Sequence, residues 1–364
     1  MLALEDGPLL SEAAALGARS DVLPLPRVLA SLGESARGRD GHGLWLQTPR
    51  ATVALARWLP RFAALLRSKK PDLLHSNGLK THLLAALVKP SGAALVWHLH
   101  DFLSERRLTA RLLPLLQRQA SLGVAVSKAV AEDARKVLGQ MRVETVLNGV
   151  RTDLFTPGRV PPIDLDALAG LTPAPTGTLR IGLVATYASW KGHHLFLEAA
   201  RRVTSPTVRF YIVGGPVYST VGSQVTLAEL SESIARLRLE SQCGLVPFQR
   251  NVAAVYAALD IVVQASTRRE PFGRTVAEAM ASGRAVVAGA AGGALEQIEH
   301  GVSGLRFTPG DPSSLSEQMG VLISAPEFRA RMQDQALSRA RSHLDAARLG
   351  GTMIRIYHSL CGQG

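Results

Sequence analysis

Two glutamates, Glu270 and Glu278, stand eight positions apart and flank a Pro-Phe-Gly break at 271–273. Residues 273–275 are predicted to open a helix, and the first N–H groups of a helix have no partners within it. Such N–H groups attract an anion. Glu278 lies about one turn into the helix and can turn towards the same anion. A phosphate between two hydroxyl-binding carboxylates matches the order of groups in a nucleotide sugar, which is sugar, diphosphate and ribose.

Short apolar runs that could position these residues alternate with helical patterns along the chain. Most runs are continuous Val, Leu, Ile and Ala rather than alternating, as expected for parallel strands covered on both faces. This rhythm predicts doubly wound α/β sheets, which bind ligands at the carboxyl ends of their strands. The predicted strands are 21–25, 71–76, 94–100, 122–127, 143–148, 179–185, 208–215, 243–248, 260–266 and 285–289. Ser127 and Gly139 are predicted to begin and end one of the helices.

The length of 364 residues favours two domains. A stretch rich in Pro, Gly and Thr at 157–178 has weak periodicity and is predicted to be a linker. The prediction is therefore a domain over 1–156, a second over 179–344, and a C-terminal helix over 345–364 that crosses back to the first domain.

The net charge is +12, from 41 Lys and Arg against 29 Asp and Glu. Nucleic acid, an anionic membrane surface or phosphorylated small molecules would each suit this charge. Aromatic residues make up only 5% of the chain and it contains no nucleic-acid-binding module, so a nucleic-acid partner is not predicted. Residues 50–70 interleave Arg and Lys with apolar side chains. Two interpretations fit that pattern, an interfacial membrane helix or a surface helix packed on a sheet.

Cys243 and Cys361 are the two cysteines, which argues against a disulfide framework. The first residues do not have the pattern of a signal peptide, and no apolar run reaches about 18 residues. A cytoplasmic protein, with possible contact at the inner face of the membrane, is therefore expected.

Two pairs of residues have the spacing of metal ligands, but neither pair is a strong candidate for a metal site. Asp164 and Asp166 form a D-x-D pair, but they lie among prolines in the predicted linker, where acidic residues are ordinarily solvated. His98 and His100 face the same side of a predicted strand, yet no third ligand is evident. No metal site is predicted.

The segment E-P-F-G-R-T-V-A-E-A-M from 270, followed by G-G-A-L-E-Q-I-E-H-G from 292, resembles the donor site of family 4 glycosyltransferases, whose E-x7-E motif matches Glu270 and Glu278. Further matches are V-L-N-G-V-R-T-D-L-F at 146–155, W-K-G at 190–192, F-Y-I-V-G-G at 210–215 and A-A-L-D-I-V-V-Q-A-S at 257–266. The resemblance implies the GT-B fold, in which two Rossmann-like domains face a cleft, with the acceptor on the N-terminal and the donor on the C-terminal side.

The resemblance also implies roles for individual residues. Glu270 would contact hydroxyls of the donor sugar, Glu278 those of the ribose, and Lys191 the diphosphate. Fixed positive charge stabilises a leaving diphosphate when no metal is present. The other expected donor-binding residues are Thr186, Gly214, Phe248, Gln249, Pro271, Phe272, Gly273, Arg274 and Thr275.

On the acceptor side, His100 matches the strand-end histidine that lies near the reacting sugar in related enzymes. We therefore expect His100 to be catalytic together with Lys191 and Glu270. His75 and His98 are expected to line the acceptor pocket. The alternative is that these histidines only pack against neighbouring side chains.

Two departures from the family pattern stand out. The family usually has Gly-Arg where this chain has Ala185-Thr186, and Arg268, Arg269 or Arg274 is a candidate replacement for that arginine. The first 25 residues match the family's first helix and second strand, so the N-terminal sheet is expected to lack its first strand.

The resemblance implies a retaining, metal-independent hexosyltransferase without a cofactor, acting on a nucleoside-diphosphate sugar and a sugar or lipid-linked acceptor. A role in bacterial surface polysaccharide or glycolipid synthesis follows from the same analogy. The alternatives are a catalytically weakened nucleotide-sugar binding protein, or another GT-B enzyme such as an epimerase or phosphorylase.

Overall fold

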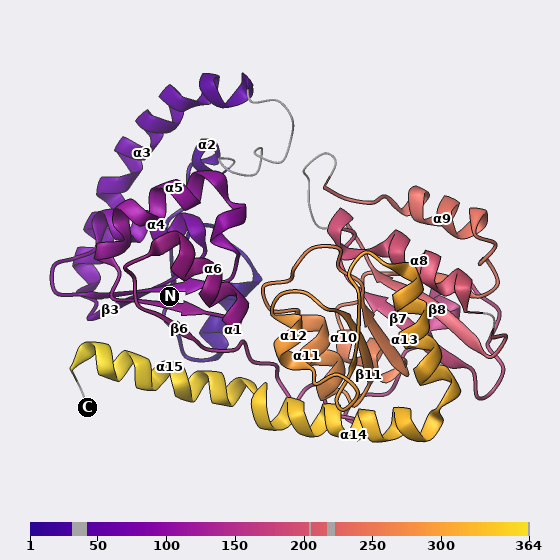
Figure 1. The fold of residues 1–364 in the computed structure, drawn as a ribbon. Helices are drawn as coiled ribbons and strands as arrows, with labels where there is room; N and C mark the ends of the chain where they lie inside the picture. The colour runs from indigo at the N-terminus through magenta and orange to yellow at the C-terminus, as the bar shows by residue number, and fades with distance from the viewer. Residues whose placement is uncertain (31–41, 204, 217–222, 363–364) are drawn as a thin grey trace.

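The computed structural model describes residues 1–30, 42–203, 205–216 and 223–362. Figure 1 shows two α/β halves side by side, joined along one edge by the last two helices. A four-stranded parallel sheet has the order β3-β4-β5-β6, and a six-stranded parallel sheet has the order β12-β11-β10-β7-β8-β9. The predicted pair of Rossmann-like α/β domains with parallel sheets is confirmed.

The first sheet contains β3 (Leu73–Asn77), β4 (Ala94–Leu99), β5 (Leu122–Ala125) and β6 (Val143–Thr145). The helices between its strands are α4 (Leu79–Val88), α5 (Arg107–Leu116) and α6 (Lys128–Leu138). The Ser127 side chain accepts from the Val130 N–H at the start of α6, and Gly139 ends the helix with a φ of 63°. Both predicted helix boundaries are therefore confirmed.

The second sheet contains β7 (Leu179–Val184), β8 (Val208–Gly214), β9 (Cys243–Pro247), β10 (Ile261–Gln264), β11 (Ala285–Gly289) and β12 (Leu305–Phe307). Its helices include α8 (His193–Arg202), α9 (Leu227–Arg236), α10 (Val252–Ala257), α11 (Arg274–Ala281), α12 (Ala294–Gln297) and α13 (Pro312–Ser324). The chain runs outward from β7 through β8 to β9, then returns to place β10 on the other side of β7. The strand order thus reverses between β7 and β10, where open α/β sheets bind ligands.

The two C-terminal helices, α14 (Pro326–His343) and α15 (Ala346–Cys361), pass from the second half to the first. Met353 and Ile356 of α15 pack with Val96 and Val124 of the first sheet. The backbone of Val150 is hydrogen-bonded on both sides of the α14–α15 junction, at 2.7 Å and 2.9 Å. The last helix therefore covers one face of the N-terminal sheet, while the domain boundaries given above stay a prediction.

The N-terminal region begins with β1 (Leu2–Ala3), α1 (Pro8–Ala15), β2 (Asp21–Val22) and α2 (Arg27–Ala30). Strand β1 pairs with β2 in a parallel sheet of their own. The four-stranded sheet does not include β1, and the two residues of β1 are too few to give a strand signal in the sequence.

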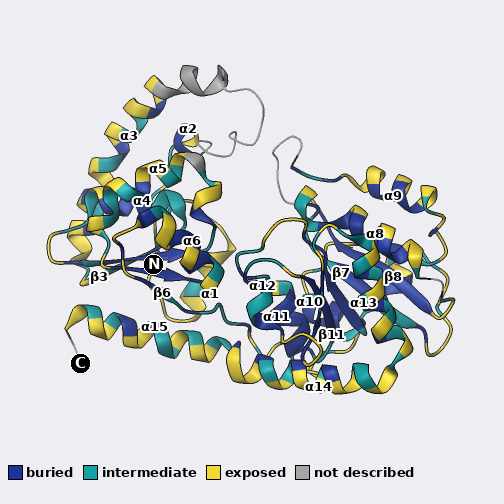
Figure 2. Cartoon of the chain, in the orientation of Figure 1, coloured by how far each residue is buried: buried dark blue, intermediate teal, exposed yellow. Residues whose placement is uncertain are grey.

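The long helix α3 (His42–Lys69) covers the segment for which two interpretations were open. Its apolar residues Trp58, Phe62 and Leu66 are buried and pack with Leu84 of α4. The Trp58 indole N–H donates to the Pro24 carbonyl at 2.9 Å. Figure 2 shows buried and exposed residues alternating along α3. The structure thus supports the packed surface helix and not an apolar face turned to a membrane.

The two aspartates of the D-x-D pair, Asp164 and Asp166, have structural roles. Asp164 caps α7 (Leu165–Ala169) by accepting from the Ala167 N–H at 3.0 Å. Asp166 is buried, accepts from the Tyr211 hydroxyl at 2.6 Å, and pairs with the guanidinium groups of Arg180 and Arg209. The expectation that both acids are solvated was wrong for Asp166, because the two arginines and the tyrosine that satisfy it lie on strands 14 to 45 residues further on.

Among the described residues, no group of three or more His, Cys, Asp or Glu side chains is placed to hold a metal ion. Within the same residues, no helix is both long and apolar enough to cross a bilayer.

Candidate donor site

The loops that follow β7 and β10 meet at the switch point of the second sheet. The first loop ends in a 3-10 turn, η4 (Ser189–Lys191), and Gly192 then begins α8 with a φ of 76°. A Cβ atom at Gly192 would lie 1.8 Å from the carbonyl oxygen of Ala265, which directly follows β10. Only glycine allows this approach, and the approach brings Lys191 next to the second loop.

The side chains of Lys191 and Glu270 form the centre of the site. The Lys191 Nζ lies 2.6 Å from Glu270 Oε1, with exposed fractions of 26% and 12% for the two side chains. The Ser266 hydroxyl donates to the same carboxylate oxygen. The pair is partly shielded from water, so its electrostatic interactions are stronger than those of a surface ion pair. The two residues predicted to be catalytic on the donor side are therefore in contact.

Gly292 and Gly293 pack against the backbone of the loop that carries Glu270. The Gly293 N–H donates to the Glu270 carbonyl at 2.8 Å. A Cβ atom at Gly293 would lie 2.2 Å from the Pro271 carbonyl oxygen. The buried Gln297 amide donates to the carbonyl oxygens of Phe272 and Gly273. Backbone contacts thus fix the segment between the two glutamates.

Helix α11 begins at Gly273, whose φ of 90° favours glycine. The buried Glu278 accepts from the Tyr256 hydroxyl at 3.0 Å and from Arg274 at 3.2 Å. Burial raises the pKa of Glu278, and Arg274 and Tyr256 partly offset the rise. Glu278 is thus a shielded acceptor, held about one helical turn after Thr275 in α11.

The other predicted donor residues lie at the carboxyl ends of β7, β8 and β9. A Cβ atom at Gly214 would lie 1.8 Å from the Ala185 carbonyl oxygen, so β8 and the loop containing Thr186 pass in close contact. Phe248 is exposed, and the Gln249 side chain donates to the Pro247 carbonyl at 3.0 Å. The sheet therefore brings all three segments to the edge that carries Lys191.

The three arginines named as replacements for the family's arginine have different positions. Arg274 pairs with Glu278. Arg269 reaches the other half of the molecule, where it pairs with Glu105 and Asp133. The Arg268 guanidinium lies 6.0 Å from the Trp190 ring, beside Lys191. Arg268 is therefore the best placed of the three, and the compensation itself stays a prediction.

The three acceptor-side histidines form a row on the first sheet, on the face covered by α15. The ring centroids of His98 and His100 are 4.1 Å apart, and those of His75 and His98 are 5.1 Å apart. The His75 Nδ1 is hydrogen-bonded to the Tyr357 hydroxyl of α15. The Nε2 atoms of His98 and His100 are buried without a partner among the described residues. Both atoms have almost no accessible surface, so a ligand hydroxyl would reach them only after neighbouring side chains move.

Burial keeps these imidazoles neutral. Desolvation, with smaller contributions from the neighbouring histidines, lowers the pKa of His98 to about 3. Desolvation also lowers the pKa of His75 and the pKa of His100. For His100, the negative charge of Asp101 partly opposes this decrease. Neutral imidazoles bind hydroxyl groups by hydrogen bonds without adding positive charge.

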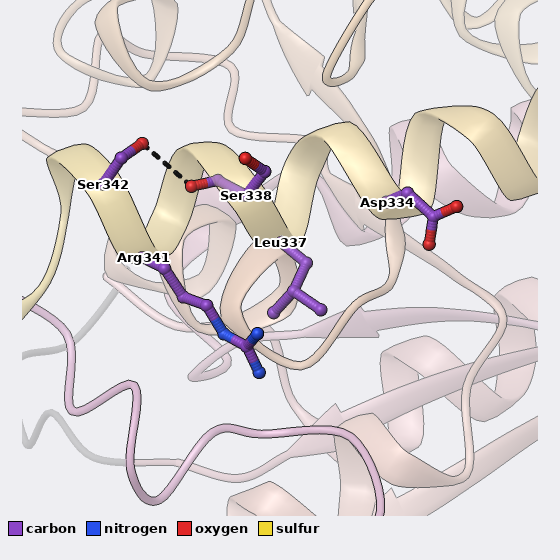
Figure 3. A pocket seen from close by; sticks show the side chains of 5 residues that line it. All are labelled: Asp334, Leu337, Ser338, Arg341 and Ser342. Atoms are coloured by element: carbon purple, nitrogen blue, oxygen red, sulfur yellow. Dashed lines mark hydrogen bonds between the residues drawn. The ribbon is translucent and has the colours of Figure 1, made fainter.

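Several supporting residues were not predicted from the sequence. Ser266, Tyr256 and Gln297 hold the donor loop and helix, and Tyr357 contacts the histidine row from 282 positions away. Of these residues, only Ser266 could have been suggested by the local sequence, because it lies shortly before the E-P-F-G segment. A separate hollow on the outer side of α14, shown in Figure 3, is lined by Asp334, Leu337, Ser338, Arg341 and Ser342, none of which is a predicted site residue.

A family model described as "Glycosyltransferase Family 4" matches residues 9–154, and one described as "Glycosyl transferases group 1" matches residues 172–339. The chain belongs to the family 4 glycosyltransferases. Its similarity to solved structures supports the same family and the GT-B fold. The Anabaena protein HepE in complex with UDP has a TM-score of 0.80 and 25% identity, covering 98% of this chain and 91% of that chain.

Of two further comparisons, one has a lower sequence identity than HepE and the other covers less of this chain. A glycosyltransferase from Rickettsia africae has a TM-score of 0.79 at 18% identity, covering 99% of this chain and 89% of that one, which shows the fold alone. A D-inositol 3-phosphate glycosyltransferase from Corynebacterium urealyticum is 29% identical over 223 residues, which is 60% of this chain and 51% of that protein. This family 4 chain thus spans about half the length of that curated relative.

The neutral histidine row predicts a pH-dependent stability. The pKa of His98 is about 3 in the fold and 6.5 in its ordinary state, so the unfolded chain takes up a proton first as the pH falls. Stability from this residue is full above pH 6.5 and is lost as the pH falls towards 3, by about 1.4 kcal/mol per pH unit.

Urea denaturation at pH 7.5 and pH 5, followed by circular dichroism, measures this loss. The loss between the two pH values is expected to be about 2 kcal/mol smaller in His98→Gln than in the wild type. His358→Gln, at an exposed position on α15, is the matched control and should behave as the wild type. Equal losses in all three proteins would contradict the account of a buried neutral imidazole.

Proposed function

We propose that this protein is a retaining, metal-independent hexosyltransferase that moves a sugar from a nucleoside-diphosphate sugar to an acceptor hydroxyl. The observation that carries the proposal is the 2.6 Å pair of Lys191 and Glu270 at the switch point of the second sheet. A diphosphate entering there meets an ammonium group, and the sugar next to it meets a carboxylate. The N–H groups that open α11 at Gly273 complete an anion site.

In the proposed reaction, Lys191 turns from Glu270 to the diphosphate, and Glu270 accepts hydrogen bonds from the sugar hydroxyls. The bond between the anomeric carbon and the diphosphate oxygen breaks through an oxocarbenium-like state. The acceptor oxygen attacks from the same face, and its proton passes to the departing phosphate. Fixed positive charge at Lys191 stabilises the developing negative charge, and this favours departure without a metal.

Uridine is the base that the comparisons favour. HepE in complex with UDP and glucose is 26% identical to this chain, with a TM-score of 0.78. The acceptor side offers the unpaired imidazole nitrogens of His98 and His100, which suit a hydroxyl-rich acceptor. A sugar or lipid-linked acceptor in bacterial surface polysaccharide or glycolipid synthesis fits these features.

Thr186 motivates the second candidate, a nucleotide-sugar binding protein with little transfer activity. The family usually has an arginine at this position, so the diphosphate here has one fixed charge fewer beside Lys191. This candidate requires donor binding without transfer, which an assay with the bound nucleotide's sugars would distinguish from the enzyme.

Calorimetric titration with UDP, GDP and ADP tests the donor site. We expect UDP to bind, and we expect Lys191→Ala and Glu278→Ala each to weaken binding by roughly tenfold to a hundredfold, the range for a lost charge-assisted hydrogen bond. Arg201→Ala removes an exposed basic side chain at the far end of α8 and is the matched control. Binding of none of the three nucleotides by the wild type would contradict the proposal.

We also propose that α5, rather than α3, contacts an anionic membrane surface near the lipid-linked acceptor. Leu108, Leu112 and Leu115 are 55%, 37% and 77% exposed, and their spacing places them on one face of the helix. Exposed arginines at 111 and 118 flank them, and residues 106–131 contain five Lys and Arg but no Asp or Glu. Figure 2 shows exposed turns along α5. Apolar residues edged by basic ones are the pattern of an interfacial helix.

Co-sedimentation with vesicles tests this contact. The wild type should bind phosphatidylcholine vesicles that contain phosphatidylglycerol and not those that lack it. Replacing the three α5 leucines by serine should abolish binding. Serine at Leu9, Leu168 and Leu227, which are 64%, 41% and 56% exposed elsewhere on the protein, is the control and should leave binding intact. Binding that survives the α5 change would contradict the proposal.

A further inference from the structure

The residue before Glu270 links the two halves of the molecule. Arg269 belongs to the donor loop, yet its guanidinium donates to three groups of the N-terminal half. These are Glu105 Oε1 at 2.7 Å, the Ser104 hydroxyl at 2.9 Å and Asp133 Oδ1 at 3.0 Å. We propose that Arg269 is a positioning residue, which couples the closed arrangement of the two domains to the placement of Glu270. The proposal rests on the function proposed above.

Four residues of the N-terminal half surround the Arg269 guanidinium, and we call them the socket: Phe102, Ser104, Glu105 and Asp133. The guanidinium carbon lies 3.7 Å from the centroid of the Phe102 ring, close enough for a cation–π contact. Phe102 and Asp133 are buried, and Asp133 also accepts from the Ser104 N–H at 3.1 Å. The socket is therefore held by its own domain and does not depend on the arginine for its shape.

A second contact joins the same parts of the two domains. The Glu296 carboxylate of α12 accepts from the N–H groups of Lys128 and Ala129, at 2.8 Å and 2.9 Å, where α6 begins. A carboxylate at the start of a helix is stabilised by the helix dipole. Asp133 lies on the same helix, so α6 receives both Arg269 and Glu296.

These two contacts lie on either side of the donor loop. Arg269 immediately precedes Glu270, while Glu296 follows the Gly293 whose N–H holds the Glu270 carbonyl at 2.8 Å. Any rotation of one domain away from the other must pull on both ends of this segment. The position of Glu270 relative to Lys191 is therefore tied to domain closure, a common way of completing an active site.

The partial exposure of Arg269 suits a contact that forms and breaks. Its side chain is 38% exposed, whereas Asp133 is 6% exposed. Opening returns the guanidinium to water at modest cost, because Arg269 is not deeply buried. The arginine fork matters as well as the charge, since three acceptors and an aromatic ring are arranged around its plane.

The test combines two readouts on the full chain. Small-angle X-ray scattering measures the radius of gyration, and calorimetry measures UDP affinity. We expect Arg269→Ala and Glu105→Arg each to enlarge the radius of gyration and to weaken UDP binding about tenfold, within the range of coupling between sites. Arg269→Lys keeps the charge but loses the fork, so it should behave nearly as Arg269→Ala does. Arg201→Ala is again the control.

The charge swap Arg269→Glu with Glu105→Arg separates coupling from simple stability. It is made together with Asp133→Asn, because a glutamate at position 269 would otherwise face the buried Asp133 carboxylate. We expect it to restore part of the compact scattering and of the UDP affinity that each single change removes. Unchanged scattering and affinity in Arg269→Ala would overturn the proposal, and so would a swap that is no better than the single variants. If the wild type does not bind UDP while Arg269→Ala still expands the molecule, the closure contact is supported and the proposed donor specificity fails.

Discussion

The close approach of Gly192 to the Ala265 carbonyl is the constraint on which the donor site depends. Any Cβ atom at this position would lie 1.8 Å from that oxygen, so another residue would push the two loops apart. The loops belong to β7 and β10, the neighbouring strands between which the chain reverses its direction across the sheet. A single steric requirement thus brings an ammonium group from one loop to a carboxylate of the other.

The rest of the C-terminal half supports this meeting point. Gly293 and Gln297 hold the Glu270 loop through its carbonyl oxygens, and the Tyr256 hydroxyl of α10 donates to Glu278 of α11. The N-terminal half adds a row of neutral histidines and the socket that receives Arg269. Lys191 and Glu270 supply charge on the donor side, whereas the imidazoles of the histidine row are neutral. This division suits the departure of a dianionic group and the approach of a hydroxyl.

Local sequence was enough to predict ten of the twelve strands in the described residues, all but β1 and β12, together with the caps of α6 and the residues Lys191, Glu270 and Glu278. These features depend on periodicity, on glycine and on a motif of fixed spacing, all of which are visible within a few positions. Contacts between distant segments were not predictable in this way. The burial of Asp166 depends on Arg209 and Tyr211, and the position of His75 depends on Tyr357 of the last helix. The role of Arg269 likewise requires a partner in the other domain.

In the proposed reaction Lys191 exchanges one anion for another, and a crystal structure with UDP bound tests this exchange most directly. We predict that the Lys191 Nζ leaves Glu270 and lies within hydrogen-bonding distance of a diphosphate oxygen, with the diphosphate at the start of α11. A structure in which the Lys191–Glu270 pair is intact at 2.6 Å while the diphosphate binds elsewhere would contradict the account.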